Sequence, residues 1–245
     1  MAVILTLSVR LIGESGRNVT VVFYSVYAAL WFLTDLYWLV YDLLRPEIRM
    51  PFAANEFGEA AVFLMLAAMV GSEVDHRAQL PLGYLVGTLV FAACNVILWI
   101  VWSGEVAQDV IVGAALGWLY YNCVRSLRWS RAFDSGDWIC LGTLCAGLIL
   151  CQGLTFPLSG NAKVVSELTA YGISLAGILF LGWKLFGVYR KDLIRERLFL
   201  SVTLLMWITT SKYMSGGNWY YLFMNLETVL IPLCFVSVRK AVKTA

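Results

Sequence analysis

The chain has 245 residues, of which 60% are apolar and 14% are charged, and its formal net charge is only +2. A soluble domain is about 45–50% apolar and about 25% charged, so this composition argues against a water-soluble protein and favours a polytopic membrane protein. The single histidine, His76, and the small net charge offer no basis for nucleic-acid binding or paired-histidine haem ligation. We therefore expect an all-α bundle whose partner is the lipid bilayer, with no nucleic-acid partner.

The first predicted element is a short apolar run that Arg10 interrupts, without the basic start of a signal peptide. We expect residues 1–17 to be an interfacial lead-in to the first membrane span. Crossing the roughly 30 Å hydrocarbon core takes about 20 apolar residues. Eight such runs follow, at about 18–44, 51–72, 80–102, 107–127, 137–156, 162–185, 197–214 and 218–238. Their connections are short, so residues 1–245 are predicted to form a single transmembrane domain.

The placement of basic residues predicts the orientation of these spans. With eight spans, fourteen of the 18 Lys and Arg residues fall on the side that holds both termini. Cytoplasmic loops retain positive charge, so both termini are expected in the cytoplasm. The sequence thus predicts a multi-pass protein of the cell (plasma) membrane.

A basic stretch closes the fourth predicted span, where Arg125, Arg128 and Arg131 are three residues apart. This spacing puts the three guanidinium groups on one face of a helix end. Such a face suits anionic lipid headgroups, and a cytoplasmic partner protein is the alternative.

Carboxylates lie well inside several predicted spans. A charged side chain at the bilayer centre costs about 2.5–3.5 kcal/mol, so an intramembrane acid is a candidate for a functional site. With a rise of 1.5 Å per residue, one polar residue from each of five spans lies roughly 8–13 Å below the outer end of its span. These residues are Asp35, Glu59, Asn95, Glu167 and Glu227.

Aromatic residues accompany two of these acids. Trp31 and Trp38 share a helix face with Asp35, and Tyr220 shares a face with Glu227. Lys212 is expected near the outer end of its helix, which leaves the acids without a paired cation. Buried carboxylates in that state protonate or bind a cation from outside. The pattern predicts an acid-lined, aromatic-walled cavity that binds a small solute or cation.

Three classes of function are open at this point. The leading hypothesis is a transporter or channel for a small cationic or amine-bearing solute, with proton coupling as an option. The second is an intramembrane enzyme that acts on a lipid-like substrate through two of Asp35, Glu59 and Glu227. The third is a sensor or assembly subunit whose acids are structural. Glu105 and Asp109 are interpreted as structural acids at a helix N-terminus. No catalytic residue, cofactor or metal site is assigned, and the six cysteines lack metal-ligand spacing.

Small residues one helical turn apart mark expected helix contacts. They occur as Gly83-xxx-Gly87, Gly113-xxx-Gly117 and Gly172-xxx-Ala176. Such pairs permit close backbone approach, either within the bundle or in a homo-oligomer.

Overall fold

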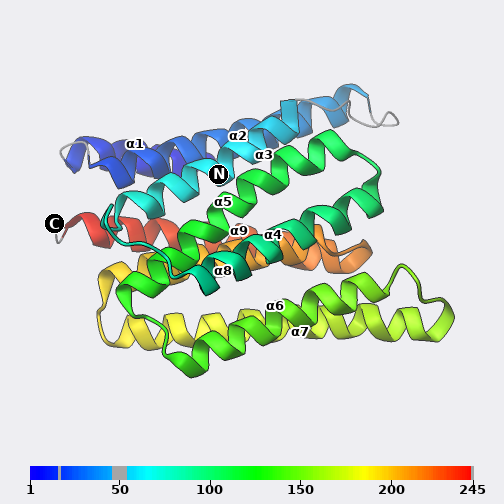
Figure 1. Cartoon of the computed structure of the whole chain (residues 1–245). Helices are drawn as coiled ribbons and strands as arrows, with labels where there is room; N and C mark the ends of the chain where they lie inside the picture. The colour runs from blue at the N-terminus through cyan, green and yellow to red at the C-terminus, as the bar shows by residue number, and fades with distance from the viewer. Residues whose placement is uncertain (16–17, 46–53, 244–245) are drawn as a thin grey trace.

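The computed structural model describes residues 1–15, 18–45 and 54–243, apart from the side chains of 42, 54–56 and 242–243. The regular secondary structure in those ranges is all α-helix, which confirms the predicted all-α fold (Figure 1). The helices described there are α1 (Ala2–Glu14), α2 (Val19–Leu44), α3 (Ala54–Ser72), α4 (Leu82–Ser103), α5 (Val106–Ser130), α6 (Ser135–Leu154), α7 (Gly160–Arg190), α8 (Ile194–Tyr213) and α9 (Gly217–Lys243). The start of the predicted span 51–72 lies outside the described residues.

Helix α8 is the centre of the fold. Helices α2–α9 run back and forth beside one another, and α8 contacts α3, α5, α7 and α9 (Figure 1). Every residue from Arg197 to Lys212 is buried. A helix enclosed on all sides has no polar face, so α8 shows no amphipathic pattern. Two of its hydroxyls are satisfied within the helix, since Ser201 and Thr203 donate to the carbonyls of Arg197 and Phe199, whereas Ser211 Oγ has no hydrogen-bond partner among the described residues.

Within the described residues, five helices are long and apolar enough to cross a membrane: α2 (over Val19–Tyr41), α4, α6, α7 and α9 (over Gly217–Ala241). This indicates a multi-pass membrane protein. The structure does not support all eight of the predicted spans. Among the residues with described side chains, α3 contributes a shorter apolar helix over Phe57–Ser72, and α5 and α8 are not among the five. Both of these polar helices pack inside the bundle, where neighbouring helices can satisfy polar groups that lipid cannot.

The turns define two ends of the bundle. The α4–α5, α6–α7 and α8–α9 turns lie at one end, which we call the α8–α9 end (Figure 1). The α5–α6 and α7–α8 turns lie at the opposite end, which we call the basic end. The predicted lead-in contains α1, which packs along α2 and α9 and buries Leu11.

Ion pairs tie the helices together at the basic end. Asp134 and Asp137 form a reciprocal capping box at the start of α6, and Lys184 Nζ of α7 lies 2.5 Å from Asp137 Oδ2. Asp192, between α7 and α8, accepts hydrogen bonds from Lys240 of α9 and from Arg197 Nη2 at 3.0 Å. The Lys240 ammonium, followed by the Arg197 guanidinium, holds the pKa of the Asp192 carboxyl below its usual value.

The small-residue pairs divide into two groups. A Cβ at Gly113 would collide with Val96, and one at Gly117 would lie 3.2 Å from Ala92 Cβ, so these two glycines permit close packing of α5 on α4. That part of the prediction is confirmed. A Cβ at Gly83, Gly87 or Gly172 would meet nothing within 4 Å. The expectation of a helix contact there within the chain is therefore wrong, while a homo-oligomer through these faces stays a prediction.

Candidate functional site

A buried ion pair joins α8 and α9 at the α8–α9 end. Lys212 Nζ lies 2.8 Å from Glu227 Oε2, and the two side chains are 7% and 1% exposed. The other carboxylate oxygen of Glu227 accepts a hydrogen bond from Thr209 Oγ1 at 2.6 Å. The short α8–α9 turn makes the two helices antiparallel neighbours, and the side chains of Lys212 and Glu227 meet although the residues are 15 positions apart in sequence. Glu227 is thus a satisfied carboxylate with a cation against it.

Aromatic rings and a second acid complete the surroundings of Lys212. Its Nζ lies 5.4 Å from the ring centroid of Trp31 and 4.9 Å from that of Tyr213, distances that allow cation–π attraction. The Tyr213 hydroxyl donates to Glu59 Oε2 of α3, and Glu59 also interacts electrostatically with Lys212. We call Lys212, Glu227, Glu59, Tyr213 and Trp31 the charged cluster.

The charged cluster changes the sequence interpretation in one respect. Acids at this depth were expected to have no paired cation, but Lys212 is buried among them. A lysine one residue from the end of a helix can follow the helix surface out to water. Here the side chain instead turns into the bundle, where α2, α3 and α9 surround it with rings and carboxylates.

Asp35 and Tyr220 lie at the margin of this cluster, whereas Trp38 is exposed on α2. Asp35 is exposed on α2 and interacts electrostatically with Glu227 and Lys212. Tyr220 is 37% exposed and interacts electrostatically with Lys212, Glu59 and Glu227. Trp38 is 51% exposed. Of the predicted aromatic residues, Trp31 is the one placed directly against the charged group.

Asn95 and Glu167 have other partners. Asn95 is buried, and its Nδ2 donates to the Phe91 carbonyl of its own helix at 2.7 Å, while its Oδ1 has no hydrogen-bond partner among the described residues. Glu167 is half-buried, and its Oε1 lies 3.9 Å from Lys163 Nζ one turn earlier on α7.

A small acid-lined cavity lies beside Glu59. Its volume is about 190 Å³, and it extends between α3, α4, α5 and α8. We call it the acidic cavity; its lining is Glu59, Trp99, Trp102, Ser103, Glu105, Gln108, Asp109, Val112 and Tyr213. Among these lining residues three are carboxylates, three are aromatic and none is basic. Ser103 Oγ lies 2.5 Å from Asp109 Oδ2 and donates to it, which orients that carboxylate without neutralising its charge.

A larger cavity adjoins the acidic cavity. Its volume is about 500 Å³, and its lining includes Lys163 and Glu167 of α7. The two cavities share Trp99, Trp102 and Tyr213 as wall residues. The indole Nε1 of Trp99 is buried and has no hydrogen-bond partner among the described residues.

The three arginines of the predicted basic stretch, near the C-terminus of α5, have different surroundings. Arg125 donates to the carbonyls of Ala78 and Asp75, each at 2.8 Å, and so fastens the α3–α4 turn. Arg128 is exposed, and its guanidinium carbon lies 5.7 Å from the ring centroid of Tyr84. Arg131 is exposed and ends α5 in a left-handed conformation with φ 56°.

Sequence reasoning missed Lys212, Tyr213 and Trp99 as parts of the arrangement, and it assigned Glu105 and Asp109 to the helix terminus alone. Their signal was present in the chain: two tryptophans and two carboxylates flank the Ser103-Gly104 turn. Asp109 does lie in the first turn of α5, so its position near the helix N-terminus and its position in the cavity wall coincide.

Comparisons with protein-family models, curated proteins and solved structures found no match to this chain. Among the described residues, no group of three His, Cys, Asp or Glu side chains could hold a metal ion.

Proposed function

We propose that this multi-pass membrane protein binds a small organic cation in the acidic cavity and carries it across the bilayer. The observation that carries the proposal is the lining itself: Glu59, Glu105 and Asp109 surround a space whose wall contains Trp99 and Trp102 and no basic residue. Carboxylates attract an ammonium group, and indole faces add cation–π attraction of about 0.5–2 kcal/mol. This chemistry favours an amine or quaternary ammonium over an anion.

The volume supports a small solute. At about 30 Å³ per water molecule, 190 Å³ corresponds to roughly six waters, below the range typical of drug-sized ligands. The adjoining cavity of about 500 Å³ offers a place from which such a solute could enter past the shared wall of Trp99, Trp102 and Tyr213. In the predicted orientation both cavities lie near the outer face.

The charged cluster supports a link between binding and movement. Glu59 belongs both to the acidic cavity and to the charged cluster, where it interacts with Tyr213 and Lys212. A cation that occupies the cavity competes with Lys212 for Glu59 and strengthens the hold of Lys212 on Glu227. Pro232 in α9 removes one backbone donor, which provides a point of bending one turn beyond Glu227.

The enzyme alternative has less support. It needs two carboxylates that face one water molecule, as general acid and general base. In this structure Glu227 Oε2 contacts Lys212 and Glu59 accepts from Tyr213, while Asp35 is exposed on α2.

The test uses choline and its uncharged isostere 3,3-dimethylbutan-1-ol, with thermal unfolding of the detergent-purified protein as the measurement. A ligand at a hundred times its dissociation constant adds about 2.7 kcal/mol to stability. We expect choline to stabilise the wild type, and Glu59→Gln and Asp109→Asn to abolish that effect. Glu196→Gln is the control, since it makes the same chemical change at the basic end of α8.

Equal stabilisation by the uncharged isostere, or full choline stabilisation of both cavity variants, would refute cation binding at this cavity. Uptake of labelled choline into proteoliposomes then tests transport separately. Binding without uptake would leave the cavity as a receptor site and refute the carrier.

A further inference from the structure

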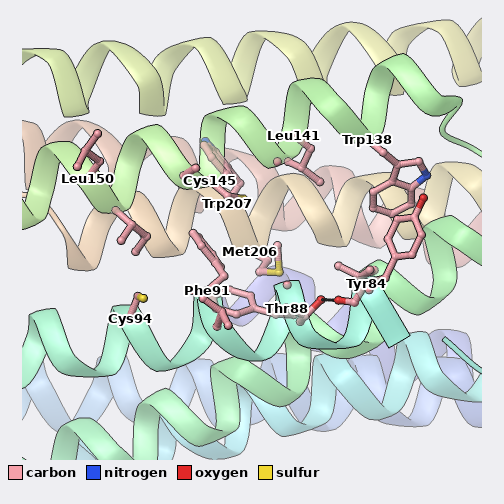
Figure 2. A pocket seen from close by; sticks show the side chains of 18 residues that line it. Tyr84, Thr88, Phe91, Cys94, Trp138, Leu141, Cys145, Leu150, Met206 and Trp207 are labelled. Carbon is pink, nitrogen blue, oxygen red and sulfur yellow. Dashed lines mark hydrogen bonds between the residues drawn. The ribbon is translucent and has the colours of Figure 1, made fainter. Parts of the chain in front are cut away.

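A third cavity lies between α4 and α6, nearer the basic end than the two cavities described above. Its volume is about 550 Å³, within the range of ligand pockets. Figure 2 shows it as a groove along the two helices, with Tyr84 and Trp138 at one end and Cys94 and Leu150 at the other. Met206 and Trp207 of the central helix α8 also line it. We call it the α4–α6 groove.

Small residues on facing helices create this space. Gly87 of α4 and Gly142 of α6 both line the groove, and both are exposed. A Cβ added at either position would meet nothing within 4 Å. These glycines therefore leave a gap between two membrane-spanning helices where a leucine pair would have closed it.

The groove has mostly apolar walls, and several of its polar side-chain atoms are hydrogen-bonded within the protein. Thr88 Oγ1 donates to the Tyr84 carbonyl at 2.7 Å, and Trp207 Nε1 donates to the Ser174 carbonyl at 2.9 Å. The Tyr120 hydroxyl is paired with Thr210 Oγ1 at 2.7 Å. Because these polar atoms already have partners, they favour a hydrocarbon occupant over a polar one.

The length of the groove fits one leaflet. Gly83 and Cys94, both in its lining, are 11 positions apart on α4, which corresponds to about 16 Å along the helix. Half of a roughly 30 Å hydrocarbon core is about 15 Å. A single acyl chain of one leaflet thus matches the distance from the basic end to the bottom of the groove.

A positive charge lies at the mouth of the groove. The exposed Arg128 guanidinium is held over the ring of Tyr84, a lining residue, and Tyr84 packs edge-on against Trp138 with ring centroids 4.9 Å apart. Aromatic residues at headgroup level and an arginine beside them are the features that bind a lipid phosphate at a membrane surface.

We infer that the α4–α6 groove is a binding site for an anionic phospholipid, which lays one acyl chain between α4 and α6 and places its phosphate at Arg128. The site is independent of the acidic cavity and of the function proposed for it.

The test measures retained lipid by native mass spectrometry after purification in detergent, with phosphatidylglycerol or phosphatidylcholine of identical acyl chains added. We expect the wild type to retain phosphatidylglycerol preferentially. Gly87→Leu and Gly142→Leu fill the groove from opposite walls and should lose most of the bound lipid. Gly172→Leu is the control, because this exposed α7 glycine also has open space but lies outside the groove.

The headgroup contact is tested by Arg128→Gln, which should lower affinity for phosphatidylglycerol about fivefold, the effect of one interfacial charge. Arg190→Gln, which removes an arginine held over an aromatic ring elsewhere at the basic end, should leave it unchanged. Two groove variants keep the test valid if one of them folds poorly. Wild-type lipid retention in a folded groove variant, or equal retention of the two lipids by the wild type, would overturn the inference.

Discussion

The buried pair of Lys212 and Glu227 makes the sharpest prediction for stability. The Glu227 carboxylate is only 1% exposed. Replacing Lys212 by Met removes its cation and leaves it with the hydrogen bond from Thr209 Oγ1. Removing one partner of a buried ion pair costs about 3–5 kcal/mol. For a chain of this size we expect the unfolding midpoint to fall by roughly 6–20 °C.

The two single substitutions should differ. In Glu227→Gln the ammonium of Lys212 keeps the faces of Trp31 and Tyr213 and the attraction of Glu59. The expected cost is therefore smaller, about 1.5–3 kcal/mol, the worth of a hydrogen bond to a charged group. The double variant, which removes both charges of the pair, should be more stable than the Lys212→Met single variant.

The assay is reversible unfolding in detergent of the wild type, both single variants and the double variant, combined into a double-mutant cycle. Residues in contact show interaction energies of about 0.5–3 kcal/mol. The control cycle uses Lys163 and Glu167, which are 3.9 Å apart with side chains 49% and 38% exposed, and should give no more than about 0.5 kcal/mol. Additive effects at Lys212 and Glu227, or a fully stable Lys212→Met variant, would refute the reasoning.

Two further predictions concern packing and pH. Gly177→Ala should cost about 1–3 kcal/mol in unfolding free energy because its Cβ would collide with the Trp207 indole, whereas Gly172→Ala, with open space, should be neutral or slightly stabilising; equal midpoints would contradict this contact. Lys240 keeps the pKa of the Asp192 carboxyl below its usual value of about 3.9. The free energy of folding that this ion pair contributes is therefore fully present above about pH 3.9, and it is lost as the pH falls through the lowered pKa of Asp192. Unfolding followed from pH 7 to pH 3 should show the advantage of the wild type over Asp192→Asn shrinking at the acid end, and a constant difference would count against the ion pair.

Part of the site could be predicted because it depends on helical rise alone. Glu59 and Glu227 are in different helices, and counting residues from the span ends placed them at a similar depth. The structure brings both to Lys212 and Tyr213. Asn95 and Glu167 have similar predicted depths but partners within their own helices. Depth along an axis says nothing about the rotation of a helix around that axis, which decides which neighbour a side chain meets.

The sequence by itself determined the class of the protein, because composition and the lengths of apolar runs are local properties that lipid constrains directly. It could not show that α8 lies at the centre. Because α8 is covered by other helices and not by lipid, it can carry polar Ser, Thr and Lys residues. Its composition is therefore less apolar than that of a typical membrane-spanning helix. Only the tertiary structure decided that Lys212 turns inward to Glu227, and that Gly87 and Gly142 face a groove while Gly113 closes on α4. Those outcomes follow from which helices are neighbours, a relation between residues distant in the chain.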